Sequence, residues 1–202
     1  MLEHAQTFER KNPYILAIGG AGCRFYRFFV NRYWQDNLIT CNTDKEGLEN
    51  IPSEQAILYG EDICMGKGCG GDVTLGEKVF AEHFASFSRL FFSKEREAFI
   101  IAGLGGGTGT GAIRCLCSKL KGTLDHRVTL FLIHPFTFEK EPIIEAAEKT
   151  IPLIEKAGIT FKLFYNDEVL SSTKKEVPIK EAMQEQFNRI ADTMCETLAD
   201  TT

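Results

Sequence analysis

The sequence predicts an α/β fold in which a mostly parallel open sheet carries helices on both faces. Short apolar runs of strand length alternate along the chain with longer segments whose apolar residues recur at helical spacing. Continuous apolar runs such as Tyr14–Ile18 and Val128–Ile133 are typical of strands buried on both faces of a parallel sheet. Glycine-rich turns follow several of these runs, at the edge where open α/β sheets bind their ligands.

Length and composition restrict the class of protein. The chain has 202 residues, of which 44% are hydrophobic, and this is enough for one sizeable core. A net charge of −5 without a Lys/Arg cluster argues against nucleic acid as a partner. No apolar run approaches the roughly 20 residues that span a membrane, and no signal peptide is visible, so we expect a cytoplasmic protein without membrane insertion. We predict a flexible arm over residues 1–13 and one domain over residues 14–202.

The cysteines and histidines predict no metal site of their own. The seven cysteines contain no CxxC pair, and the four histidines are scattered without the spacing of metal ligands. We therefore expect reduced thiols, most of them buried.

Strands and helices alternate throughout the predicted order. The predicted strands are residues 14–18, 38–41, 55–58, 99–102, 128–133 and 160–164. The predicted helices follow Cys23 and Gly111 and cover about residues 75–90, 139–157 and 178–198. Because each strand is followed by a helix, the connections are expected to be right-handed crossovers within a parallel sheet.

The last predicted helix, residues 178–198, buries one face and exposes the other. Pro178 suits its first turn, where a backbone N–H has no partner in the helix. The apolar stripe consists of Ile179, Ala182, Met183, Phe187, Ile190, Ala191, Met194 and Leu198. Charged residues occupy the opposite side, which favours a single-domain protein over a helix enclosed between two domains.

The stretch Gly103–Gly111 is the central candidate for a binding site. Five of the seven residues from Gly105 to Gly111 are glycines, and they lie between a predicted strand and a predicted helix. Glycine allows backbone amides to approach a ligand closely, and the helix that follows adds the positive end of its dipole. Thr108 and Thr110 can donate hydroxyl hydrogen bonds to phosphate oxygens. The stretch predicts a phosphate-binding turn, although it lacks the Lys-Ser or Lys-Thr of a P-loop.

Two further turns predict the same chemistry. Gly19–Cys23 follows the first strand, and the loop Gly60–Asp72 contains four glycines within six residues. Asn42 and Asp44 follow the second strand, where they suit either a turn or the binding of a ribose or a nucleotide-bound magnesium ion. Gly20-x-Gly22 with Asp44 about 20 residues later also keeps open a dinucleotide-dependent oxidoreductase, although Phe25 occupies the position of its third glycine.

The string GGGTGTG between a strand and a helix resembles the signature of the tubulin and FtsZ superfamily, and the FtsZ branch in particular. Further motifs follow in the order and spacing of that branch: Asn42–Asp44, Gly66–Asp72, Pro135–Glu139 and Asn166–Asp167. The resemblance covers Tyr14 to Leu198. It implies a Rossmann-like nucleotide-binding domain that binds GTP or GDP with Mg²⁺.

The resemblance also implies a role for individual residues. The implied phosphate-binding residues are Gly20, Ala21, Gly22, Gly105, Gly106, Gly107, Thr108 and Gly109, with Gly68, Cys69 and Gly70 at the γ-phosphate. Asn42 lies in the motif that brings Asp44 and Glu46 close to the magnesium ion. Pro135 and Glu139 belong to the ribose motif, and Asn166 is placed at the guanine edge.

The chain departs from the FtsZ pattern at the base and sugar. Ile143 stands where FtsZ carries an arginine, Met183 replaces the phenylalanine that stacks on guanine, and Phe187 replaces an Asn or Asp. Base recognition then depends on Asn166 alone, which predicts a weakened or relaxed site.

The sequence ends before two further FtsZ features. In FtsZ a loop after the last helix carries acidic residues that act on the nucleotide of the neighbouring subunit, and a second domain follows. We therefore expect a GTP-binding relative that hydrolyses GTP weakly or not at all alone and that associates with, caps or modulates FtsZ-type filaments. Full-length FtsZ and a second copy of the chain are the expected partners. The alternative is a nucleotide-sensing interaction module unconnected with filaments.

Overall fold

A computed structural model describes residues 13–30, 37–91, 96–122, 127–172 and 178–200. The predicted arm over residues 1–13 lies, apart from Pro13, outside the described residues. The strands are β1 (Tyr14–Ile18), β2 (Leu38–Asn42), β3 (Ala56–Leu58), β4 (Ala98–Gly103), β5 (Val128–His134) and β6 (Thr160–Tyr165). The helices are α2 (Gly19–Phe29), α3 (Glu61–Cys64), α4 (Val73–Phe91), α5 (Gly107–Leu120), α6 (Glu141–Ala157), α7 (Asn166–Ser172) and α8 (Ile179–Asp200), with short 3₁₀ turns η2 (Glu46–Leu48) and η3 (Ser53–Gln55).

The sheet is parallel throughout and has six strands in the order β3-β2-β1-β4-β5-β6. This confirms the predicted α/β class. The register places Ile18 beside both Cys41 and Ala102, so β1, β2 and β4 end at the same level. The strand order reverses between β1 and β4, because the chain runs outward to β3 from one and to β6 from the other.

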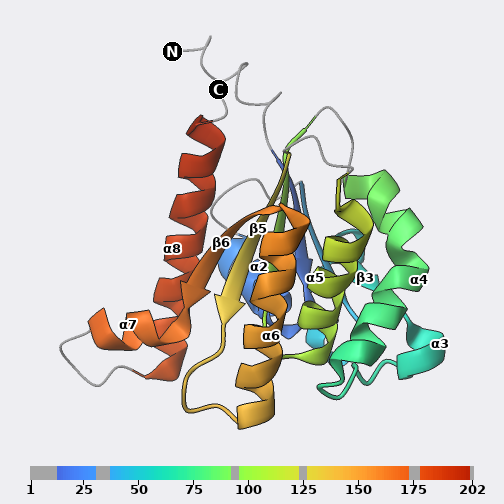
Figure 1. The fold of residues 1–202 in the computed structure, drawn as a ribbon, viewed down its shortest axis with the longest axis horizontal. Coiled ribbons are helices and arrows are strands. Elements are labelled where there is room, and N and C mark those ends of the chain that lie inside the picture. The colour runs from blue at the N-terminus through green and yellow to red at the C-terminus, as the bar shows by residue number, and fades with distance from the viewer. Residues whose placement is uncertain (1–12, 31–36, 92–95, 123–126, 173–177, 201–202) are drawn as a thin grey trace.

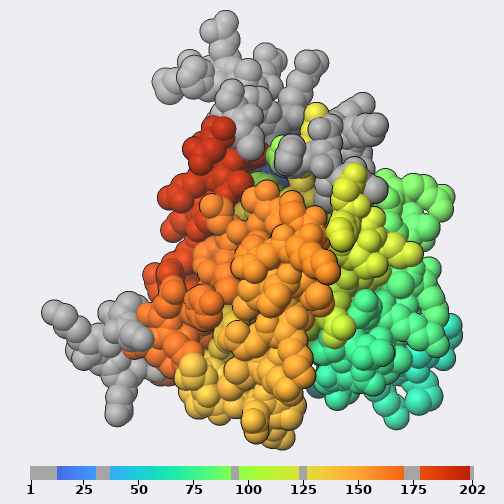
Figure 2. Space-filling model, viewed as in Figure 1, coloured from blue at the N-terminus to red at the C-terminus, as the bar shows by residue number. Residues whose placement is uncertain are grey.

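Helices cover both faces of this sheet (Figure 1). On one face α4, α5 and α6 pack over alternate strand residues such as Leu16, Ile100 and Leu130. On the opposite face α2 and α8 pack over Ile15 and Phe131 and their neighbours. Figure 2 shows the first face closed by α4, α5 and α6, which lie next to one another and hide most of the sheet. No helix among the described residues has the length and hydropathy that a membrane span requires.

Close contact between α4 and α5 explains several glycines. A Cβ at Gly76 would overlap the Gly107 carbonyl, and a Cβ at Gly111 would overlap the backbone N of Glu77. The two helices therefore touch backbone to backbone, which only glycine allows.

The structure corrects five details of the sequence prediction. The helices after the first and the central glycines begin at Gly19 and Gly107, inside their glycine runs, and the loop Gly60–Asp72 contains the short helix α3. Glu139 precedes α6, which begins at Glu141 with Pro142 in its first turn, a position that suits proline. An additional helix, α7, begins at Asn166.

The last helix follows the predicted amphipathic pattern with two exceptions. Most of the predicted stripe of α8 is buried, but Ile179 at its start is 55% exposed, because the first turn extends past the sheet edge it covers. Gln186 is buried within the stripe although it is polar.

All seven cysteines are free thiols, six of them buried and Cys195 half-buried. This confirms the expected reduced and mostly buried thiols.

Candidate functional site

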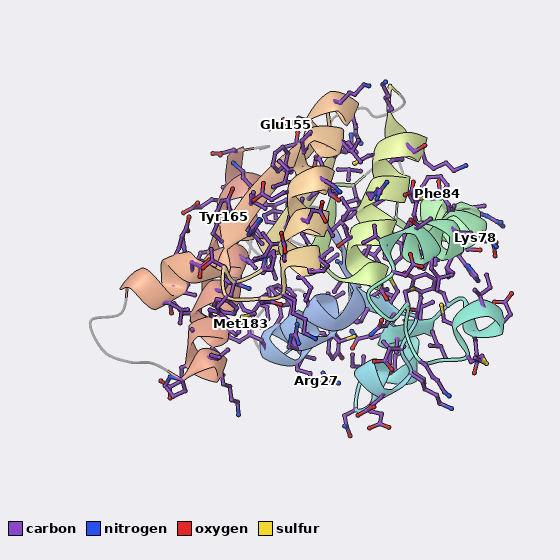
Figure 3. All side chains as sticks on the ribbon, turned by 60° about the horizontal axis from the view of Figure 1, so that its bottom comes forward. Arg27, Lys78, Phe84, Glu155, Tyr165 and Met183 are labelled. Atoms are coloured by element: carbon purple, nitrogen blue, oxygen red, sulfur yellow. The ribbon has the colours of Figure 1, made fainter. Side chains whose placement is uncertain are left out.

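The candidate site lies at the carboxyl ends of β1 and β4, where the strand order reverses. At such a point one connection passes to each face of the sheet, and a crevice is left between them. Here the chain leaves β1 into α2 on one face and leaves β4 into α5 on the other. Figure 3 brings this edge of the sheet toward the viewer.

The first two glycine turns touch each other at this point. Gly19 has a φ of +70° and passes the chain directly from β1 into α2. A Cβ on it would lie 3.2 Å from the backbone N of Gly109. The amino ends of α2 and α5 therefore converge, and their unpaired N–H groups and dipoles point to one region.

The third turn, Gly66–Asp72, is joined to the other two by a hydroxyl bridge. The Thr43 hydroxyl lies 2.7 Å from the Thr108 hydroxyl and 3.4 Å from the Cys69 sulfur. Gly68 N donates to the Thr43 carbonyl at 3.0 Å, which fixes the loop beside the end of β2. The three predicted turns thus lie side by side along one edge of the sheet.

Three adjoining hollows run along this edge, and together we call them the groove. The central hollow, of ≈ 270 Å³, lies over the turns after β1 and β4. The loop-side hollow, of ≈ 670 Å³, extends toward β2 and the third turn. The helix-side hollow, of ≈ 680 Å³, extends toward α8. Gly20 and Thr108 line the first two, while Glu139 and Met183 line the central and helix-side hollows.

Most residues that the resemblance implies line the groove. They are Gly20, Ala21, Asn42, Asp44, Glu46, Gly68, Cys69, Gly70, Gly106, Gly107, Thr108, Gly109, Pro135, Glu139, Asn166, Met183 and Phe187. Gly22 and Gly105 do not. A Cβ at Gly22 would overlap the backbone of Ala17, and Gly105 has a φ of +97° with Ile143 against it. These two glycines shape the turns and do not face the groove.

Some groove glycines leave space that a side chain would fill. A Cβ at Gly20, Gly106, Gly70 or Gly71 would meet nothing within 4 Å. Packing does not require glycine at these four positions, and only Gly70 and Gly71, with φ of +58° and +84°, need it for their backbone conformation. The open positions suit a ligand that approaches the backbone closely.

The Thr110 hydroxyl does not face the groove, contrary to its predicted contact with phosphate. The side chain is fully buried, and its hydroxyl accepts a 2.8 Å hydrogen bond from Gly105 N. Thr110 therefore stabilises the turn from below. Thr108 lines two hollows and keeps the predicted position.

The acidic residues of the loop-side hollow are few and partly engaged. Asp44 Oδ1 accepts from Glu46 N at 3.1 Å, and Asn42 Oδ1 accepts from Thr43 N at 2.9 Å. Among the described residues no three His, Cys, Asp or Glu side chains converge as a metal site by themselves. Mg²⁺ in nucleotide sites needs only one or two carboxylates, because phosphates and water complete its shell. Asp44 and Glu46 are consistent with that arrangement.

Asn166 provides an unpaired acceptor in the wall of the groove. The residue is 5% exposed, and its Oδ1 has no hydrogen-bond partner among the described residues. It lines both the central and the helix-side hollow. A buried amide oxygen without a partner carries a desolvation cost that a donor on a bound ligand relieves.

The sequence departures have different structural consequences. Phe187 is buried and packs edge-on against Phe25, with ring centroids 5.7 Å apart, so it forms the floor of the helix-side hollow. Met183 is half-buried and faces two hollows, where its flexible side chain can contact an aromatic ring. Figure 3 shows Met183 at the start of α8, close to α2 and Arg27.

Arg24 is a groove residue that the sequence reasoning missed. Its side chain is exposed and lines all three hollows. In the sequence it is one of several arginines among aromatic residues, and spacing alone predicts only that it lies on the solvent-exposed side of a helix. The signal that could have found it is its position one helical turn after Gly20.

Comparison with known proteins assigns the chain to a family. A family model described as "Tubulin/FtsZ family, GTPase domain" matches residues 13–174. FtsZ 1 of Pyrococcus abyssi is 31% identical over 176 residues, which are 85% of this chain and 45% of that protein. FtsZ of Aquifex aeolicus is 29% identical over 178 residues, with 85% and 46% covered. The chain therefore spans less than half the length of these curated relatives.

Solved structures agree with the sequence comparison. A GTPγS-bound protofilament of CetZ2 from Haloferax volcanii matches 92% of this chain and 57% of that chain, with 26% identity and a TM-score of 0.75. An empty FtsZ dimer from M. jannaschii matches 98% of this chain and 57% of that chain, with 22% identity and a TM-score of 0.75, and shows the shared fold. The fold is that of the tubulin/FtsZ nucleotide-binding domain, and the chain belongs to the tubulin/FtsZ family and carries its GTPase domain.

Proposed function

We propose that the groove binds a guanine nucleotide, GTP or GDP, together with Mg²⁺. The observation that carries this proposal is the convergence of three glycine turns at one end of a groove whose other end holds the unpaired Asn166 oxygen. In this arrangement the backbone amides of Gly20 and Gly106 donate to phosphate oxygens, and the nearby helix dipoles favour their negative charge. The family match supports the same ligand.

We assign each part of the nucleotide to one of the hollows according to the polar residues that line it. In the proposed complex Gly68, Cys69 and Gly70, which line the loop-side hollow, contact the γ-phosphate, and Asp44 and Glu46 lie beside the metal ion. When bound, Mg²⁺ supplies charge neutralisation to the phosphates. In the proposed complex Glu139, one of whose carboxylate oxygens accepts from Phe136 N at 3.1 Å, contacts the ribose. Asn166 Oδ1 accepts from an N–H donor on the base.

A thermal-shift panel tests this proposal. GTP, GDP, ATP and NAD are each added with and without Mg²⁺, because a ligand of the folded state raises the melting temperature by mass action. We expect GTP and GDP to raise it, GTP more so with Mg²⁺, and NAD to have no effect. A response to NAD alone would instead indicate the dinucleotide-dependent oxidoreductase.

We further propose that the chain associates with FtsZ-type filaments through the edge that carries the groove, and that residues 1–202 alone hydrolyse GTP weakly or not at all. The resemblance to FtsZ implies that acidic residues of a neighbouring subunit act on the nucleotide, which supports weak hydrolysis by a single copy. Met65 and Phe138 are 72% and 62% exposed in the turns beside the groove, where a protein partner at this edge would cover them.

Co-sedimentation tests the filament proposal. Increasing amounts of the protein are added to assembling FtsZ with GTP, and pelleted polymer and released phosphate are measured. We expect capping to lower polymer mass at substoichiometric ratios, and a Met65→Ser/Phe138→Ser double variant to be less effective. Unchanged polymer mass and turnover, together with a nucleotide-dependent dimer in light scattering, would favour the nucleotide-sensing module.

A further inference from the structure

Positive charge is distributed unevenly along the groove. Among the described residues, Arg24 is the only Lys or Arg that lines the central hollow. Arg27 and Lys67 line the loop-side hollow, and Arg27 and Lys180 line the helix-side hollow. Arg24 is also the only one of these cations that faces all three hollows. For an anion at the centre of the groove, Arg24 is therefore the only cationic side chain among the described lining residues.

Arg24 and Arg27 differ in what they already bind. One Arg27 nitrogen donates to the carbonyl oxygens of Gly47 and Glu49, each at 3.0 Å, and so fastens the turn η2 to α2. No described residue accepts a hydrogen bond from Arg24 or forms an ion pair with it. Its five N–H donors are therefore available to a ligand.

The geometry of α2 directs Arg24 toward the glycine turn. Side chains of an α-helix lean toward its amino end, so a residue covers the turn that precedes it. Arg24 lies four residues after Gly20 in α2, whose amino end forms one wall of the central hollow. The guanidinium thus adds a full charge to the partial positive charge of the helix end.

Across the central hollow from Arg24, none of the described lining residues carries a positive charge. The FtsZ resemblance places an arginine at position 143, where this chain has Ile143 in α6. Ile143 lines the central hollow, and its carbonyl and Cγ2 lie against Gly105. A polyphosphate in the groove therefore receives no cationic contact from α6.

We propose that Arg24 binds the polyphosphate of the nucleotide, so that α2 supplies the positive charge that α6 lacks. The inference rests on the proposed nucleotide binding and adds a specificity residue to that site. The planar guanidinium donates two N–H groups to phosphate oxygens, and such charge-assisted bonds are stronger than those between neutral groups. Arg24 then selects for nucleotides that carry phosphate over the free nucleoside.

Calorimetric titration of Arg24→Gln tests the inference. The ligands are GTP, GDP and guanosine, each with Mg²⁺, and the control is Arg89→Gln, which removes the same charge from an exposed position in the last turn of α4. Arg24→Gln is expected to weaken GTP and GDP by at least about tenfold, and to leave guanosine within about twofold. The affinity of the wild type for GTP is expected to fall more steeply with added KCl than that of Arg24→Gln.

The outcomes separate the two proposals. If the wild type binds neither GTP nor GDP, the proposed function fails. If the wild type binds GTP and Arg24→Gln binds it equally well, the role of Arg24 fails while nucleotide binding stands. An equal loss for guanosine and GTP also overturns the inference, because it places Arg24 at the base or in the fold and not at the phosphates.

Discussion

The glycines at the groove fall into two groups according to what a side chain would meet. Gly20 and Gly106 face open space, whereas Gly111 lies against the backbone of α4 and Gly109 against the Gly103 carbonyl. In the sequence these residues look alike, because both groups belong to turns rich in glycine. Only the folded structure distinguishes a glycine that faces open space from one that lies against the backbone of another segment.

Alanine substitutions are expected to separate these two groups. Gly20→Ala leaves a helical backbone intact and should change the free energy of unfolding by less than about 1 kcal/mol, while its methyl group enters the groove and weakens GTP binding. Gly111→Ala must push α4 away from α5 and should destabilise the fold by about 1–3 kcal/mol or more. Urea unfolding and GTP titration of both variants measure the two effects. A stable Gly111→Ala or a Gly20→Ala with unchanged GTP affinity would contradict this division.

Hydrogen bonds of Thr43, the residue that follows β2, hold the loop Gly66–Asp72 in place. Thr43 is fully buried, and its hydroxyl bridges Thr108 and Cys69. Thr43→Val keeps the shape of the side chain and removes the bridge, so we expect a loss of about 0.5–1.5 kcal/mol in stability. Amides of the loop should exchange with solvent faster. Thr150→Val is the matched control, because the buried Thr150 hydroxyl donates only to Ala146 O of its own helix and its loss should leave the loop unchanged.

Helix α5 is enclosed on nearly all sides, and its thiols acquire altered acidity. Burial raises the pKa of Cys115 and of Cys117 from the ordinary 9.0 to about 11. Between these two pH values the folded chain therefore keeps both thiols protonated, whereas in the unfolded chain they are largely ionised. The stability contribution is complete below pH 9.0 and declines as the pH rises through about 11.

Unfolding free energies measured between these pH values test this linkage. The wild type should lose stability as the pH rises, with up to about 1.4 kcal/mol per pH unit from each such thiol. A Cys115→Ala/Cys117→Ala variant should be less stable at neutral pH and show a shallower decline. Parallel curves for the two proteins would show that these thiols do not contribute.

The sequence predicted the elements of the sheet better than the roles of single residues. Apolar runs located the strands, and helical periods located the longer helices. The glycine turns located the edge of the sheet that carries the groove. Thr110 was misassigned because its inward direction depends on where α5 begins, and Arg24 was missed because α2 begins at Gly19 and not after Cys23 as predicted. Asn166 and Phe187 line one hollow only in the folded molecule, so whether Phe187 fills or lines that hollow could not be predicted from spacing.

At the scale of the whole molecule, thiol accessibility reports the integrity of the core. Cys195 is the one cysteine that is half-buried, and the other six are buried. With iodoacetamide at about pH 8.5 we expect one fast modification, at Cys195, followed by slow modification of the rest as the domain unfolds. Mass spectrometry of the digested protein locates the label. A Cys195→Ser variant should lose the fast phase, and rapid labelling of Cys41 or Cys115 would contradict the packing of the core.

The reversal of strand order between β1 and β4 has a mechanical consequence. Residues 14–58 build one half of the sheet and residues 98–165 the other, and the halves meet along a single row of hydrogen bonds between two strands. A ligand in the groove would contact both halves at once and hold them together. Pulling the protein apart at its two edge strands, β3 and β6, should therefore require a larger rupture force when the ligand is bound, so a bound nucleotide would raise the mechanical stability of the domain.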